Sequence, residues 1–166
     1  MKSEKISEMK KWILYITILG FATYWASNLM LWFPWSHSAT LGITLMLTLG
    51  VALWAFVTFL ALRTYPKTEL IKGALIIALI FLLISVITDY IFFGLIRNAM
   101  EELYHPTTFY GYGFLLVWPL ILALIFKKKI FERKKNTTNS DIIKAGISGL
   151  ICLGALTLII ILRIEI

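Results

Sequence analysis

The chain has 166 residues, of which 60% are hydrophobic and 15% charged, and its formal net charge is +7. Soluble domains are typically about 45–50% apolar and about 25% charged, so the composition indicates an integral membrane protein with little room for a soluble domain. The single cysteine, Cys152, excludes an intramolecular disulfide and any paired-cysteine zinc or redox motif. The basic residues flank apolar runs without a nucleic-acid-binding motif, so we expect no nucleic-acid partner.

Five apolar segments come close to or exceed the roughly 20 residues that a membrane-spanning helix needs. We therefore predict an all-α, polytopic integral membrane protein with a single membrane domain over 1–166. The five transmembrane helices are expected near 12–33, 39–62, 73–96, 109–126 and 142–162. Trp118-Pro119 predicts a kink or a break in the fourth helix. Residues 127–141 are expected to form a basic cytoplasmic linker before the last helix, flexible over Phe131–Asp141.

The last predicted helix is rich in small residues. Ala145 with Gly149, and Ser148 with Cys152, form small-xxx-small pairs that let helices approach closely. We expect this helix to pack against another one along these positions.

The Lys and Arg residues alternate between successive connections. The N-terminus and the second and fourth connections are basic, whereas the first connection has no Lys or Arg and the third has only Arg97. Basic residues are retained on the cytoplasmic side, so the N-terminus is predicted inside and the C-terminus outside. We expect a multipass protein of the plasma (inner) membrane of a prokaryote.

The first and third predicted helices end in similar ways. "YWASNLMLWFPW" aligns with "VITDYIFFGLI" so that Ser27-Asn28 falls on Thr88-Asp89, and each helix leaves through a connection with a His and a Pro. This suggests a parallel repeat of a two-helix unit, helices 1–2 and 3–4, as occurs in some transporters. The alternative is chance similarity between two apolar helices.

Polar and small residues share one face on each of three predicted helices. These faces are Thr17, Gly20, Tyr24 and Asn28; Thr40, Thr44, Thr48, Ala52 and Ala55; and Ala74, Ala78, Ser85 and Asp89. Because lipid does not satisfy polar groups, we expect all three faces to turn inward and to form a polar pocket in the outer half of the bundle. The candidate pocket residues are Asp89, Asn28, Ser27, Tyr24, Ser85, Thr88, Tyr110 and Tyr112.

Asp89 is the only charged residue between Leu82 and Ile96. An ionisable group inside a membrane indicates a proton, ion or substrate site by default. A second interpretation is a structural clasp, in which Asp89 is hydrogen-bonded to Asn28, Ser27 or a tyrosine. In a third, Asp89 lies near the interface, is wetted from outside and has little role.

The outer connections hold the other candidates for proton or metal chemistry, His37, Glu101, Glu102 and His105. Glu101 and His105 would be neighbours on a helix, but no complete metal-binding motif is present, so we expect no metal and no cofactor. The aromatic residues near helix ends are expected to form interfacial belts; they are Trp12, Trp32, Trp35, Tyr65, Tyr104 and Tyr110.

We therefore expect a protein whose outward-facing pocket around Asp89 and Asn28 binds or passes a small solute or ion. Its partners would be the lipid bilayer and either further copies of itself, in a homo-oligomer, or other membrane subunits. One alternative is a membrane-embedded enzyme that uses Asp89 and His105 as acid and base on a lipid-borne substrate. Another is a non-catalytic membrane assembly or interaction factor. The catalytic role is the less expected one, because no nucleophile-elbow or nucleotide-binding motif occurs.

Overall fold

The computed structural model describes residues 2–162, apart from the side chains of residues 2–5, 32, 35, 36 and 102. Over this range the chain is helical, with short connections and no strand. The elements in chain order are α1 (Lys2–Ser27), η1 (Asn28–Trp32), α2 (Phe33–His37), α3 (Ala39–Leu45), η2 (Met46–Gly50), α4 (Val51–Arg63), α5 (Leu70–Asp89), η3 (Tyr90–Ile96), η4 (Met100–Tyr104), α6 (Pro106–Ile125), α7 (Lys127–Glu132) and α8 (Asn139–Ile161).

Five helical stretches are long and apolar enough to cross a membrane, which confirms the predicted all-α architecture with five spans. They are Ile6–Leu31, Ala39–Arg63, Leu70–Ile96, Pro106–Ile125 and Asn139–Ile161. The last three begin three residues earlier than hydropathy predicts. Polar caps explain two of these starts: His105 accepts the Thr107 N–H before α6, and Thr138 forms a capping box with Asp141 before α8.

The fourth span is one unbroken helix. Pro119 lies inside α6 and is fully buried, so the break expected at Trp118-Pro119 does not occur. Proline is tolerated inside membrane helices where neighbouring helices and local adjustments accommodate the lost backbone hydrogen bond.

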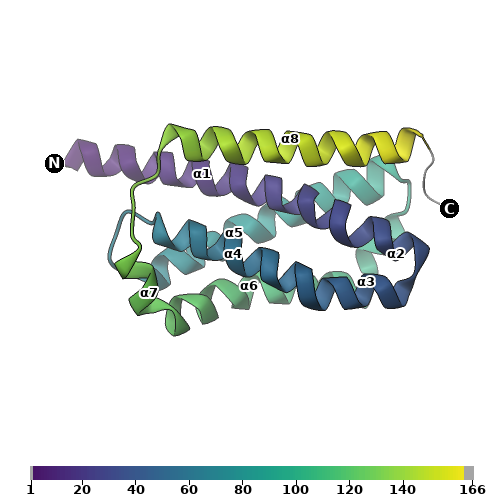
Figure 1. Cartoon of the computed structure of the whole chain (residues 1–166), viewed down its shortest axis with the longest axis horizontal. Helices are drawn as coiled ribbons and strands as arrows, with labels where there is room; N and C mark the ends of the chain where they lie inside the picture. Colours follow the sequence, from purple (N-terminus) through teal and green to yellow (C-terminus); the bar gives the residue numbers. More distant parts are fainter. Residues whose placement is uncertain (1, 163–166) are drawn as a thin grey trace.

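The spans lie side by side as an elongated bundle, with the first and last described residues at opposite ends (Figure 1). α1 contacts α8, α5 and α4, while α5 also packs along α6. Gly149 makes the contact between α1 and α8 close, because a Cβ atom there would lie 2.9 Å from the Cα of Ala22. Ala145 and Gly149 are buried as their spacing predicts, whereas Ser148 is exposed and Cys152 half-buried.

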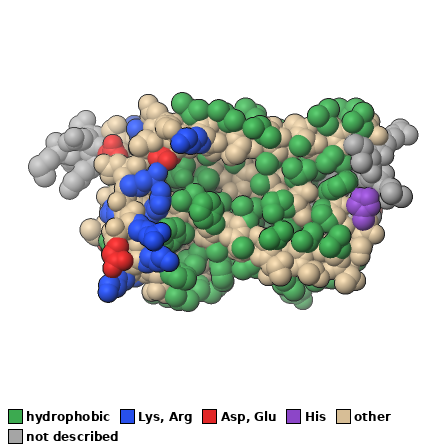
Figure 2. Space-filling view, in the orientation of Figure 1, with side chains coloured by type: hydrophobic (Ala, Val, Ile, Leu, Met, Phe, Trp, Pro, Cys, Tyr) green, Lys and Arg blue, Asp and Glu red, His purple; other side chains and the backbone are tan. Residues whose placement is uncertain are grey.

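Most of the Lys and Arg side chains gather at one end of the bundle (Figure 2). Figure 2 shows the Lys and Arg residues around α7 and the ends of its neighbouring helices, with a histidine at the opposite end. We call these the basic end and the far end. The clustering agrees in pattern with the alternation of basic connections along the chain, and the cytoplasmic location of the basic end remains a prediction.

The larger apolar core lies toward the basic end and joins α1, α4, α5 and α6. Trp12 is fully buried there, donates its Nε1–H to the Ala61 carbonyl at 2.9 Å, and packs on Tyr65 with ring centroids 4.8 Å apart. The prediction that Trp12 and Tyr65 belong to an interfacial belt is therefore wrong, because both rings face other helices. Tyr104 and Tyr110 are exposed, and the side chains of Trp32 and Trp35 lie outside the described residues.

The threonine stripe of the second span faces outward, which corrects the prediction that it lines the bundle interior. Thr40, Thr44, Thr48 and Ala52 are all exposed. Thr44 donates its hydroxyl to the Thr40 carbonyl at 2.8 Å, and Thr48 donates to the Thr44 carbonyl at 2.7 Å. A hydroxyl that donates to a carbonyl of its own helix needs no partner on another helix. This face can therefore lie outside the bundle without leaving a hydroxyl unpaired.

Three spans contain π-helical segments, η1, η2 and η3, in the halves nearer the far end. The Phe33 N–H bonds to the Asn28 carbonyl, and the Arg97 N–H to the Phe92 carbonyl, each five residues back. Such wide turns are rare in proteins overall, and those that occur are often found at functional sites. Asn28 begins η1 and Asp89 directly precedes η3, so both candidate residues lie where an α-helix widens.

Candidate functional site

Asp89 lies at the junction of three membrane-spanning helices. Its Oδ1 accepts the Tyr24 hydroxyl of α1 at 2.7 Å, and its Oδ2 accepts the Tyr112 hydroxyl of α6 at 2.7 Å. Asp89 is 9% and Tyr24 4% exposed, whereas Tyr112 is half-buried. Each carboxylate oxygen is thus held by a neutral donor from a different helix.

The positions of these residues along their helices explain why they meet. Asp89 precedes the end of its span by seven residues, Tyr24 precedes the end of its own by seven, and Tyr112 follows the start of its span by six. At about 1.5 Å per residue, each of the three residues lies about 10 Å along its helix from the terminus at the far end of the bundle. α1 and α5 run in the same direction and α6 runs in the opposite one (Figure 1), so side-by-side packing of the three helices brings the three groups to one level.

The face of α5 that leads to Asp89 is lined with small residues, as predicted. Ala74, Ala78 and Ser85 are 0%, 2% and 5% exposed. Small side chains let neighbouring helices approach closely. Asp89 continues this face and consequently points at α1 and α6.

Three other predicted pocket residues, Asn28, Thr88 and Ser27, have no described hydrogen bond to Asp89. The Asn28 amide donates to the Tyr24 carbonyl at 3.1 Å, so the expected direct pairing of Asn28 with Asp89 is absent from the described hydrogen bonds. Thr88 is buried and donates its hydroxyl to the Ile84 carbonyl of its own helix. Ser27 is buried, and its Oγ has no hydrogen-bond partner among the described residues.

The electrostatic setting of Asp89 has no cationic side chain among its described bonding partners. The two ion pairs found among the described residues are Lys72–Glu69 and Lys135–Asp141, both at the basic end. The Lys72 ammonium lowers the pKa of Glu69 there through a charge-assisted hydrogen bond. Asp89, by contrast, is held within the described part of the chain by the partial charges of two tyrosine hydroxyls, which offset part of the cost of burying a carboxylate.

Those outer-connection candidates whose side chains are described, His37, Glu101 and His105, have no described bond to Asp89. His105 caps α6, its Nδ1 lying 2.7 Å from the Thr107 hydroxyl, and His37 packs edge-on against Phe33. Glu101 is exposed, and Tyr110 is 75% exposed. The Glu102 side chain lies outside the described residues. Over the described part of the chain, no three His, Cys, Asp or Glu side chains are placed to share a metal ion.

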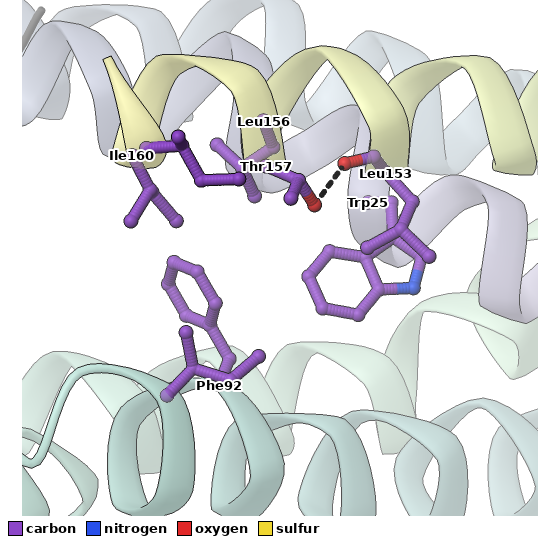
Figure 3. Close-up of a pocket in the computed structure, with 8 residues that line it drawn as sticks. Trp25, Phe92, Leu153, Leu156, Thr157 and Ile160 are labelled. Atoms are coloured by element: carbon purple, nitrogen blue, oxygen red, sulfur yellow. Dashed lines mark hydrogen bonds between the residues drawn. The ribbon is translucent and has the colours of Figure 1, made fainter. Parts of the chain in front are cut away.

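Two apolar clefts border the site region. One, of about 130 Å³, lies between α1, η3 and α8; Figure 3 shows Trp25 and Phe92 facing Leu156 and Ile160 across it. The other, of about 350 Å³, is a groove between α1 and α5 that passes Thr88, the residue before Asp89. Neither cleft is lined by Asp89 itself.

The sequence placed Tyr24 and Tyr112 among the candidates and allowed a tyrosine as a direct partner of Asp89, but it did not specify which tyrosine. The spacing of Tyr24 indicates that it faces the same way as Asn28, because the two residues lie one helical turn apart. Nothing in the spacing of the fourth span distinguishes Tyr112 from Tyr110, which faces outward.

Comparison of the chain with protein-family models, with curated proteins and with solved structures finds no match. A function for the chain is therefore inferred from the geometry of the site.

Proposed function

We propose that the protein is a small multipass protein of a prokaryotic plasma membrane that binds a monovalent cation, either a proton or a metal ion, at Asp89. The supporting observation is the Asp89 carboxylate, buried between three helices and held by two tyrosine hydroxyls, with no ion pair among the described residues. Retention of the basic end in the cytoplasm would place this site in the outer half of the membrane.

An uncompensated charge inside a membrane is costly. Placing a carboxylate at the bilayer centre costs about 2.5–3.5 kcal/mol on insertion scales, and less toward the interface. Two neutral hydrogen bonds offset part of this cost, and a bound cation would remove the net charge. The tyrosine oxygens keep lone pairs while donating to Asp89, so they are able to serve as further oxygen ligands for a hard cation.

The test is a binding experiment on the purified protein in lipid nanodiscs. Thermal unfolding is followed across a pH series, and at constant ionic strength in sodium, potassium or choline chloride. We expect the unfolding midpoint to respond to pH if the cation is a proton, or to one metal ion over choline if it is a metal. The response should disappear in Asp89→Asn, which keeps the shape of the side chain and removes its charge.

Glu101→Gln is the matched control, because Glu101 is an exposed carboxylate in a connection at the same end of the bundle. It should respond to pH and to cations as the wild type does. An Asp89→Asn variant that kept the wild-type response would refute the proposed site.

The second candidate function is a membrane assembly factor in which Asp89 acts as a clasp between helices. The observation that favours it is the same pair of hydrogen bonds, since they join α5 to α1 and to α6. A clasp binds no metal ion, so the wild-type unfolding midpoint would be the same in sodium, potassium and choline chloride, and Asp89→Asn would lower it equally in each salt. The salt series in nanodiscs therefore separates a metal-ion site from a clasp.

A further inference from the structure

The basic end presents a cationic surface that follows directly on an apolar one. Leu124 and Ile125, at the end of α6, are exposed, and so are Lys127, Lys128 and Lys129 at the start of α7. The change from apolar to cationic side chains within two residues is the pattern expected where the hydrocarbon of a membrane meets its headgroups.

The segment that carries these charges is fixed to the bundle. Ile130 of α7 is 1% exposed and belongs to the larger apolar core. Beyond α7, the Lys135 N–H bonds to the Arg63 carbonyl at 3.1 Å, and Lys134 Nζ donates to the Lys67 carbonyl at 2.8 Å. The cationic surface is therefore held in place before any ligand arrives.

Two donors without a partner lie beside this surface. The Nε of Arg63 and the Oγ1 of Thr137 are buried and have no hydrogen-bond partner among the described residues, and Thr137 is 4% exposed. Thr137 follows Lys135 by two residues, so its backbone lies within about 7 Å of the residue that bonds to Arg63. Leaving such donors unpaired is costly, and an anionic oxygen would satisfy them.

The charge balance also favours an anionic ligand. Residues 127–135 contain six basic side chains and one acidic side chain, Glu132. Glu69 and Asp141, the nearby carboxylates, are already engaged by Lys72 and Lys135. Clusters of four to eight basic residues beside a membrane helix typically bind anionic lipid.

We propose that α7 and residues 133–137, together with Arg63, bind the phosphate group of an anionic phospholipid headgroup. The exposed lysines attract the lipid, and Arg63 and Thr137 donate to its phosphate oxygens. This site is independent of the cation site at Asp89, which lies toward the other end of the bundle.

The test uses the full-length protein in a non-ionic detergent and native mass spectrometry. The protein is titrated separately with phosphatidylglycerol, phosphatidylcholine and inorganic phosphate. We expect phosphatidylglycerol to bind at least about tenfold more tightly than phosphatidylcholine, and this preference to be lost in K127Q/K128Q/K129Q. Thr137→Val, which replaces the hydroxyl with a methyl group of similar size, should weaken phosphatidylglycerol binding several-fold.

The control variant is K10Q/K11Q/K144Q, which removes three charges from the same end outside α7 and should keep the preference. Circular dichroism establishes that each variant is folded. Equal binding of the two lipids would overturn the proposal, as would an equal loss in the control variant or unchanged binding in Thr137→Val. Inorganic phosphate binding as tightly as phosphatidylglycerol would overturn the assignment to lipid.

Discussion

Removing the Tyr24 hydroxyl is the sharpest perturbation of the Asp89 site. Tyr24→Phe leaves the ring in place, yet deprives Asp89 Oδ1 of the donor that lies 2.7 Å away. Hydrogen bonds between membrane helices contribute about 0.6 kcal/mol on average and up to about 1.7 kcal/mol, and bonds to charged groups reach about 1.5–3 kcal/mol. Because Tyr24 is 4% exposed and water cannot easily replace the hydroxyl, we expect Tyr24→Phe to lower the free energy of unfolding by about 1.5–2 kcal/mol.

Tyr112→Phe should lower the free energy of unfolding less, by about 1 kcal/mol. Tyr112 is only half-buried, so water reaches Asp89 Oδ2 more easily than it reaches Oδ1. The free energy of unfolding is measured by reversible denaturation in mixed micelles with far-UV circular dichroism. In an Asp89→Leu background both effects should shrink toward zero, since the acceptor is gone.

Tyr110→Phe is the control for both changes. Tyr110 is two residues from Tyr112 and 75% exposed, so its loss should stay within about 0.5 kcal/mol of the wild type. If Tyr24→Phe were no more destabilising than Tyr110→Phe, or if its effect persisted in Asp89→Leu, the assignment of the hydrogen bond would be refuted.

Two further predictions concern the packing of α1. Gly149→Ala should destabilise the protein by about 1–3 kcal/mol, because the new Cβ would lie 2.9 Å from the Ala22 Cα and would push α8 away from α1. Trp12→Phe should cost about 1–2 kcal/mol beyond its loss of packing, because the buried Nε1–H that bonds to the Ala61 carbonyl disappears. Both losses are read from the same unfolding curves.

Each change has a matched control in the same chain. A Cβ atom added to Gly154 would meet no described atom within 4 Å, so Gly154→Ala should be neutral or stabilising where Gly149→Ala is not. The buried Nε1 of Trp118 has no described partner, so Trp118→Phe should lose packing only. If Gly149→Ala and Gly154→Ala lowered the free energy of unfolding equally, the close contact of Gly149 with Ala22 would be contradicted. If Trp12→Phe and Trp118→Phe did so, the hydrogen bond from Trp12 to the Ala61 carbonyl would be contradicted.

Asp89 illustrates how far sequence reasoning reaches into the site. Its helical face, with Ala74, Ala78 and Ser85, identified it as inward-pointing, and these side chains are indeed buried. The partners considered for it were Asn28, Ser27 or a tyrosine, and the described hydrogen bonds come from two tyrosines, Tyr24 and Tyr112. The rotation of each helix about its axis sets which polar side chain reaches a neighbour, and this rotation depends on packing across the whole interface.

The predictions for the threonine stripe and for Trp12 failed for a related reason. A threonine that donates to its own helix needs no partner elsewhere, so Thr44 and Thr48 are free to face outward. An aromatic residue near a helix end is equally compatible with a lipid interface and with a helix contact. Nothing in the sequence separates these outcomes before the helices are docked.

What the sequence by itself determined is the class of protein, five helical spans and the charge difference between the ends of the bundle. These depend on the length, hydropathy and charge of local segments, which a single chain displays directly. Only the tertiary structure decided which faces meet, that Gly149 closes on Ala22, and that two tyrosines from different helices hold the one carboxylate. Such contacts join residues distant in sequence, and the close packing of side chains between helices selects them.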